Sequence, residues 1–421
     1  MVLSLAPVSA PADQQTTEDT AGQDAASGRG WGSRARNVIF IQGDGMGIAH
    51  RELIRLATKG QNGELAMNKL EYTGFVHTDS ADTEEAATDS AAAATAYSTG
   101  VRTYNGAIAV DINKNPVTTL LEQARDADKS TGLVTTSQVT DATPAAFGAH
   151  VPDRADQSEI ARQFIEDTEV DVILGGGEDF WYPEGNAGAW EDNPAKDPTE
   201  QSKGTKGNLV EQAQAAGYRY VRNADELDAV RRPGKLLGLF ANEEMFEHKS
   251  EDVVEPPALY EPSVPLKTMS SKALQLLSRD RDGFFLLIEE EGIDEMAHHA
   301  NAELTVKSGA ALDDTVAMAV RFASRTPGTL VLVVGDHETG GLAIENIDEA
   351  DENAPGEQTE DEVTVAETDG KLKMTVDWTT NGHTGAATPI TASGPGAERL
   401  GKVLKNTDVH DAVLRAMGLS G

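Results

Sequence analysis

The chain has 421 residues and no cysteine, and 70 acidic against 35 basic side chains give it a formal net charge of −35. The lack of cysteine excludes disulfides, thiolate metal sites and a cysteine nucleophile. So large an acidic excess argues against nucleic acid as a partner, because phosphate backbones require a basic surface. The acidic residues are spread along the whole chain. This favours a protein adapted to high salt, where the screening length falls from about 10 Å at 0.1 M to about 3 Å at 1 M.

The N-terminal segment, residues 1–36, is expected to be either disordered or the remnant of a signal peptide. Residues 2–12 are small or apolar and end like a cleavage site, but they lack a basic start and a full apolar core. Residues 11–33 are polar and typical of disorder. We therefore expect a secreted, extracellular protein. No apolar run approaches the roughly 18 residues of a membrane span, so we expect no membrane partner.

Continuous apolar runs mark the predicted strands, as is typical of a parallel sheet covered on both faces. The run 37–42 leads into Gly43-Asp44-Gly45-Met46-Gly47, whose glycines allow a tight turn under a ligand. In chain order, the predicted strands are 37–42, 131–136, 171–174, 218–221, 235–240, 284–288, 329–334, 372–376 and 386–393.

Helices are predicted between these strands. The alanine run after Ser90 is strongly helix-forming. Pro116 is expected at the first position of a helix that ends near Asp128, and Asp408 is expected to cap the last helix. The predicted helices start near 48, 90, 116, 155, 208, 223, 265 and 408, and one more helix includes residues 312–323.

Alternating strands and helices predict the α/β class with a large, mostly parallel central sheet. Residues 37–421 are expected to form a single catalytic domain, since large α/β sheets often run this long. Stretches near 181–208, 241–263 and 345–371 lack periodicity and are rich in turn-forming or acidic residues. We therefore expect surface insertions there.

Ser90 stands where a loop becomes a helix. The unpaired N–H groups and the dipole of a first helical turn form a site for an anion. Taken alone, Ser90 is more simply explained as an N-cap. Other segments, however, bring Asp, Glu or His to the C-terminal ends of strands, where open α/β sheets build their sites. We therefore predict that Ser90 is a nucleophile facing metal ions.

The candidate metal ligands follow the apolar strands. Asp294 and His298 are four residues apart and share a helix face, Asp336 and His337 are adjacent, and His383 lies in a glycine-framed loop. Histidines combined with carboxylates suit zinc. Three oxygen groups suit magnesium better, namely Asp44, Thr143 and Glu289. Each residue alone could be an ordinary surface or capping residue, and His299 could replace His298.

Six motifs, in this order, resemble those of the alkaline phosphatases. They are Gly-Asp-Gly-Met-Gly (43–47), Thr-Asp-Ser-Ala (88–91), Ser-Thr-Gly-Val-Arg-Thr-Tyr-Asn-Gly (98–106), Asp-Ala-Thr-Pro (141–144), Gly-Asp-His-Glu-Thr-Gly-Gly (335–341) and Gly-His-Thr-Gly (382–385). The resemblance covers roughly residues 37–416. It implies a three-layer α/β/α sandwich, hydrolysis of small phosphate monoesters and a homodimer.

The same resemblance implies a role for each residue of the site. Ser90 would be phosphorylated during turnover, and Asp89 would orient Arg154, which would hold two phosphate oxygens. Two zinc ions and one magnesium ion would be bound. The implied ligands are Asp294, His298 and His383 for the first zinc, Asp336 and His337 for the second, Asp44 as a bridge, and Thr143 and Glu289 for magnesium, with Asp141 reaching it through water.

One position departs from the family pattern. Glu295, after Asp294, stands where such enzymes usually carry Lys, His or Trp, which puts a local contact to phosphate in doubt. A phosphodiesterase or sulfatase of the same superfamily and a phosphate- or metal-binding protein without turnover are the alternatives. The pair Thr143 and Glu289 argues against a phosphodiesterase, which typically lacks the third metal. The absence of cysteine argues against a sulfatase, and the presence of Ser90 with Arg154 argues against a binding protein without turnover.

Overall fold

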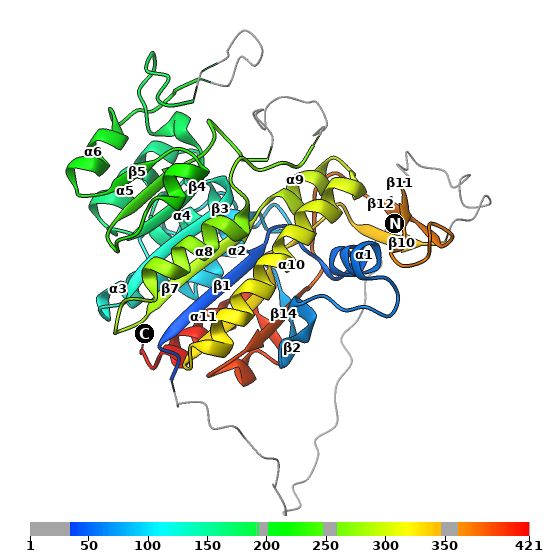
Figure 1. Cartoon of the computed structure of the whole chain (residues 1–421). Coiled ribbons are helices and arrows are strands. Elements are labelled where there is room, and N and C mark those ends of the chain that lie inside the picture. The colour runs from blue at the N-terminus through cyan, green and yellow to red at the C-terminus, as the bar shows by residue number, and fades with distance from the viewer. Residues whose placement is uncertain (1–33, 191, 193–200, 247–258, 347–360, 421) are drawn as a thin grey trace, which may run out of the picture. The chain divides into compact units, whose positions relative to one another are not determined.

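Strand β1 (Asn37–Gly43) lies in the middle of a ten-stranded sheet, between β7 (Phe284–Glu290) and β8 (Thr329–Gly335) (Figure 1). All residues of these three strands are buried. The structure is a computed structural model that describes residues 34–190, 192, 201–246, 259–346 and 361–420. Most of the predicted N-terminal segment 1–36 therefore lies outside the described residues, as do parts of the three predicted insertions.

The strand order across the sheet is β15-β2-β14-β8-β1-β7-β3-β4-β6-β5. Only the pairings of β14 with β2 and β8 are antiparallel. The other pairings are parallel, which confirms the predicted mostly parallel sheet. The remaining strands of the sheet are β2 (Tyr72–His77), β3 (Ser130–Gln138), β4 (Val172–Gly176), β5 (Arg219–Val221), β6 (Leu236–Leu239), β14 (Thr388–Ser393) and β15 (Val403–Lys405).

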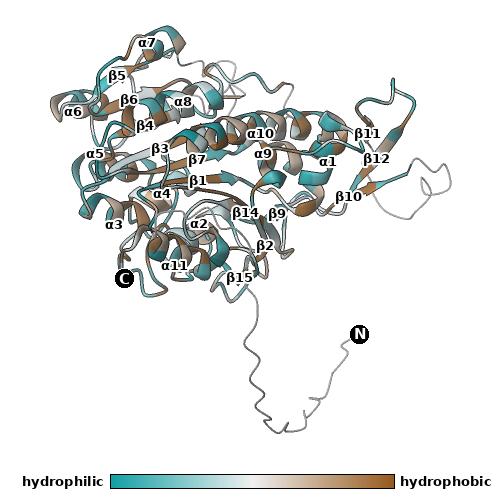
Figure 2. Cartoon of the chain, turned by 60° about the horizontal axis from the view of Figure 1, so that its bottom comes forward, coloured by the Kyte–Doolittle hydropathy of each residue, from teal (hydrophilic) through white to brown (hydrophobic). Residues whose placement is uncertain are grey.

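Side chains alternate between the two faces of the sheet and enter two separate cores. Phe40 points into one core, whereas Ile39 and Ile41 point into the other. Figure 2 shows helices on both sides of the strands, as in the expected three-layer α/β/α sandwich. The first core is covered by α2 (Ser90–Thr99), α3 (Leu120–Asp126), α4 (Ala142–Gly148), α5 (Gln157–Glu166), α6 (Leu209–Ala215) and α11 (Asn406–Met417). The second is covered by α1 (Ile48–Lys59), α7 (Ala224–Asp228), α8 (Leu266–Leu277), α9 (Gly292–His298) and α10 (Ala302–Arg325).

Two helix starts differ from the prediction. Pro116 forms a bridge with Val110 and is not helical. Helix α3 begins four residues later because Thr119 and Glu122 form a reciprocal capping box. Helix α11 begins at Asn406, so Asp408 does not occupy the N-cap position. Its carboxylate instead accepts a hydrogen bond from the backbone N–H of Lys405 from within the first turn.

A second, three-stranded antiparallel sheet consists of β10 (Leu342–Glu345), β11 (Asp361–Thr364) and β12 (Lys373–Trp378). Its apolar side chains pack around Leu53 of α1. The prediction of an irregular insertion at 345–371 is therefore wrong for part of its described residues. The described residues of 181–208 and 241–263 contain neither helix nor strand, as expected.

The described residues belong to one compact unit. None of the helices that they form is both long enough and apolar enough to cross a membrane.

The capping box gives a test of the corrected helix start. We expect Thr119→Ala to lower the free energy of unfolding by about 1–2 kcal/mol, because the Thr119 hydroxyl accepts the N–H of Glu122 and also donates to Phe147 O. Thr119→Ser keeps the hydroxyl and should remain within about 0.5 kcal/mol of the wild type. Urea unfolding of both variants measures this, and equal losses would contradict the assignment.

Candidate active site

The parallel strands bring acidic side chains to one edge of the sheet. Gly43 of β1 lies opposite Glu290 of β7 and Gly335 of β8. The residues next to these positions, Asp44 and Asp336, therefore emerge side by side at the C-terminal ends of the strands. This is the edge at which open α/β sheets place their ligands.

Ser90 is the first residue of α2 and is almost fully buried. The N-cap is Asp89, whose Oδ1 accepts the N–H of Ala92, so the structure does not support the simpler explanation of Ser90 as the cap. Ser90 Oγ instead lies 3.1 Å from Nε2 of His337. The helix start thus presents a hydroxyl to the groups at the strand ends.

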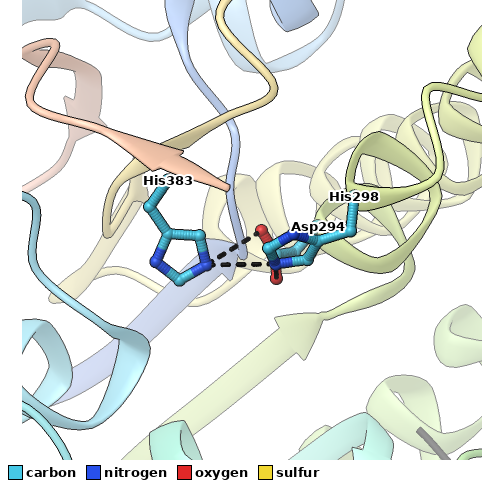
Figure 3. A group of neighbouring side chains, drawn as sticks. All are labelled: Asp294, His298 and His383. Carbon is cyan, nitrogen blue, oxygen red and sulfur yellow. Dashed lines mark hydrogen bonds and ion pairs between the residues drawn. The ribbon is translucent and has the colours of Figure 1, made fainter. Parts of the chain in front are cut away.

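The first group consists of Asp294 and His298 of α9 and His383 of β13 (His383–Thr384). Figure 3 shows the two histidine rings pointing at each other beside the carboxylate. His298 Nε2 lies 3.1 Å from Asp294 Oδ2, and His383 Nε2 lies 3.7 Å from Asp294 Oδ1. All potential ligand atoms of the group lie within 4.8 Å of one another.

The tautomers of these histidines fit a bound cation. Nδ1 of His298 contacts the carbonyl of Asn381 at 2.6 Å, and Nδ1 of His383 contacts the carbonyl of Thr88 at 2.9 Å. Because a carbonyl only accepts, each Nδ1 carries a proton, and in the neutral rings both Nε2 atoms have free lone pairs. These two Nε2 atoms face each other at 3.1 Å. A metal ion would satisfy both lone pairs.

The second group consists of Asp44, Asp336 and His337. Nε2 of His337 lies 3.3 Å from a carboxylate oxygen of each aspartate. Asp44 Oδ1 and Asp336 Oδ2 are buried without a hydrogen-bond partner, as metal ligands would be in the absence of their ion. The His337 and His383 rings stack with their centroids 3.6 Å apart, so the two groups are adjacent.

The third group is built from oxygen atoms. Thr143 of α4 lies 3.5 Å from Asp44 Oδ2 and accepts a hydrogen bond from Gln42 Nε2 at 2.8 Å. Glu289 of β7 accepts a hydrogen bond from Thr135 at 2.6 Å. The predicted partner Asp141 is engaged differently, because its Oδ1 pairs with Arg154 at 2.8 Å.

Arg154 connects the third group to the helix start. Its guanidinium lies 3.5 Å from Asp89 Oδ2, which agrees with the expected contact, but its shorter contact is with Asp141. Its side chain is 32% exposed, so an incoming anion can reach it. The two carboxylates hold the guanidinium next to Asp89, the residue that precedes Ser90.

Burial, with mutual repulsion, raises the pKa of Asp44, Glu289 and Asp336, whereas the neighbouring histidines hold the pKa of Asp294 well below its ordinary value in spite of its burial. Burial, with the charge of Asp336 next, raises the pKa of Asp44 well above its ordinary value. Burial raises the pKa of Asp336 to about 7 and that of Glu289 to about 8, although hydrogen bonds from Thr135 and Thr143 oppose the shift at Glu289. Such a set of carboxylates is stable in its charged form only beside cations.

The sequence profile described as alkaline phosphatase matches residues 35–354. The chain belongs to the alkaline phosphatase family. It is therefore a phosphomonoester hydrolase of a metal-dependent family.

Relatives match over almost the full length. Alkaline phosphatase 4 of Bacillus subtilis is 30% identical, over 91% of this chain and 88% of that protein. Streptomycin-6-phosphate phosphatase of Streptomyces griseus is 33% identical, over 98% of this chain and 95% of that protein. The solved alkaline phosphatase of the Antarctic bacterium TAB5 is 25% identical with a TM-score of 0.74, over 92% and 100% of the two chains. A variant of the TAB5 enzyme has magnesium bound in its M3 site, with a TM-score of 0.70.

Glu295, the departure from the alkaline phosphatase pattern, lies half-buried on α9 between Asp294 and His298. Burial lowers the pKa of His298. The negative charges of Asp294 and, to a smaller degree, Glu295 raise this pKa more than burial lowers it, so it reaches about 10. The glutamate thus acts on the charge of the first group through space.

Sequence reasoning missed several residues that hold the ligands. Thr339 donates a short hydrogen bond to Asp294 and lies 3.3 Å from His337 Nδ1. Gly45 has a φ of 64°, and a Cβ there would lie 2.5 Å from Asp294 Oδ1. Gly45 belongs to the motif 43–47 and Thr339 to the motif 335–341. Their contacts with Asp294 could not be predicted, because side-chain contacts between distant segments leave no periodic signal in a sequence.

The first group can be tested by zinc binding. We expect zinc at 100 times the dissociation constant of the first group to raise the free energy of unfolding of the wild type by about 2.7 kcal/mol through that group. Asp294→Asn should lose most of this gain at the same zinc concentration, because Asp294 contacts both histidines of the group. Asp282→Asn, on the exposed surface, is the control. Equal stabilisation of all three proteins would show that Asp294 binds no metal.

Proposed function

We propose that the protein hydrolyses phosphate monoesters through a phosphoserine at Ser90, with zinc at the first and second groups and magnesium at the third. The contact between Ser90 Oγ and His337 Nε2 carries this proposal. It aims the hydroxyl at the second group, which adjoins the first group through the stacked rings of His337 and His383.

The residues of each group fit the proposed ions. Two imidazoles and a carboxylate suit zinc, and an imidazole with two carboxylates does so as well. Glu289, Thr143 and the nearby Asp44 offer only oxygen, which suits magnesium, and the magnesium in the TAB5 variant supports this choice. Bound there, the ions would supply Lewis-acid stabilisation and water of lowered pKa.

The chain's own residues would direct two successive displacements. Ser90 Oγ forms a bond to phosphorus while the bond from phosphorus to the leaving alcohol breaks, and the serine proton is balanced by protonation of the alcohol. Water then breaks the phosphoserine ester, which restores the serine hydroxyl and releases inorganic phosphate. Arg154, fixed by Asp89 and Asp141, would bind two phosphate oxygens in both steps.

Small phosphate monoesters are the proposed substrates. A phosphodiesterase would need space for a second ester group and typically lacks the third group, whereas here Thr143 lies beside Asp44. The Streptomyces relative is named as a phosphatase of streptomycin 6-phosphate. This supports monoesters of small organic alcohols as the class.

Replacement of the nucleophile is the direct test. We expect Ser90→Ala to lower kcat by at least about a thousandfold, because the Ser90 hydroxyl at the start of α2 is the proposed nucleophile and faces the second group. Zinc and magnesium content should stay near the wild-type level, and Ser271→Ala on the exposed face of α8 should leave kcat unchanged.

Acid quenching during turnover should trap a phosphate on Ser90 of the wild type. A phosphate on another residue, or full activity of Ser90→Ala, would refute the proposed nucleophile.

We also propose a secreted homodimer adapted to high salt. The family resemblance supports the dimer, and the composition of residues 1–36 supports secretion. The charge of −35 supports the salt adaptation, because its self-repulsion is screened only at high ionic strength.

The salt dependence should be steep. We expect the melting temperature and the specific activity to rise together between about 0.1 M and several molar sodium chloride, as the Debye length falls to about 3 Å at 1 M. Sucrose at matched water activity controls for excluded-solute effects and should raise the melting temperature less. A flat response to salt would mean that the acidic surface has another cause.

A further inference from the structure

Two motif residues have no role in the proposed reaction. Glu338 follows His337, and Thr384 follows His383. They lie on the short strands β9 (Glu338–Thr339) and β13, which pair antiparallel with Thr384 opposite Glu338. Each strand has only two residues, so the ladder between the segments is minimal. Outside this ladder, Gly340 N donates to Gly382 O at 3.0 Å, so contacts beyond the two strands also help to fix the separation of His383 from His337.

The Glu338 carboxylate provides such a contact. It is only 6% exposed, and three donors satisfy it. Its Oε2 accepts a short hydrogen bond from the Thr384 hydroxyl and one from Gly341 N at 3.2 Å, while Oε1 accepts from Leu342 N at 3.1 Å. One carboxylate therefore joins β13 to the turn that follows the second group.

The same side chain also meets the Asp44 turn. A Cβ on Gly47 would lie 2.3 Å from Glu338 Cγ. Gly47 has a φ of −72°, which any residue can adopt, so the space taken by Glu338 explains the glycine better than its backbone does. His50 on the next turn of α1 approaches Glu338 Oε1 at 3.8 Å. Two other segments that carry candidate ligands, the Asp44 turn and β13, thus pack on the buried side chain of Glu338.

We propose that Glu338 is a positioning residue that, through Thr384, holds His383 at the distance from His337 that two adjacent metal ions require. The inference rests on the proposed metal centre. The ring of His383 also contacts Thr88 O through Nδ1, approaches His298 and Asp294 through Nε2 and stacks on His337. The bond from Thr384 to Glu338 adds a buried anchor at the next residue of β13, on the segment that carries His337. Removing an outer-shell partner of a metal ligand typically costs 10- to 100-fold in metal affinity.

Thr384→Val is the sharpest variant, because it keeps the shape of the side chain and removes only the hydroxyl donor. Thr384→Ser keeps the donor and is the matched control. We expect zinc titration of the wild type to show two sites. In Thr384→Val the site that includes His383 should weaken by about 10- to 100-fold while the site of Asp44, Asp336 and His337 stays within a few-fold of the wild type.

The serine variant should behave like the wild type, and the metal-free forms of all three proteins should melt at similar temperatures. A purely structural defect would lower the melting temperature of metal-free Thr384→Val and weaken both zinc sites together. That result, or equal zinc affinities in the valine and serine variants, would overturn the inference.

Glu338→Gln provides an independent test if the Thr384→Val variant does not fold. The glutamine amide keeps one oxygen that can accept, but its NH2 group faces a donor that the carboxylate had accepted. We therefore expect the contacts of residue 338 to loosen and the first zinc site to weaken more than the second. Unchanged affinity in this variant would also overturn the inference. A wild type that binds no zinc at either site would instead refute the proposed metal centre, so the two failures are distinguishable.

Discussion

The repulsion among buried carboxylates is the constraint on which the active site depends. The register of β1 with β7 and β8 forces Asp44, Glu289 and Asp336 to one edge of the sheet, where little water can solvate them. Burial alone disfavours each charge, and their proximity disfavours it further. Cations at the centre would remove both penalties at once. They would also let a protein with a charge of −35 attract an anionic substrate, with Arg154 as the accessible protein cation next to Asp89.

Much of this arrangement could be predicted from the sequence, because buried parallel strands are continuous apolar runs and their C-terminal ends carry the ligands. Two helix starts, those of α3 and α11, were predicted at the wrong residue. Pro116 was a plausible first helical residue, but the capping box of Thr119 and Glu122 satisfies two donors at once and moves the start of α3. In the three-stranded sheet, β12 was predicted as the strand 372–376, but β10 and β11 were missed because the dense acidic residues around them resemble a loop.

The predicted ligands come together in the structure, but their supports could not be predicted. The pairing of Asp141 with Arg154 and the bond from Thr339 to Asp294 join segments far apart in the chain. Such contacts depend on three-dimensional packing, and a single sequence carries no periodic trace of them. Glu338 lies next to a predicted ligand, yet its role depends on Gly47 and Thr384, which belong to other segments.

The unequal burial of the two groups has a consequence for assembly. In the second group, Asp336 and His337 have no exposed side-chain surface and Asp44 has 4%, whereas His298 and His383 in the first group are 30% and 18% exposed. An ion in the second group is therefore enclosed by the folded chain, while one in the first group remains within reach of solvent. The enclosed ion would be acquired as the chain folds, and the other could exchange afterwards with ions of the surrounding solution.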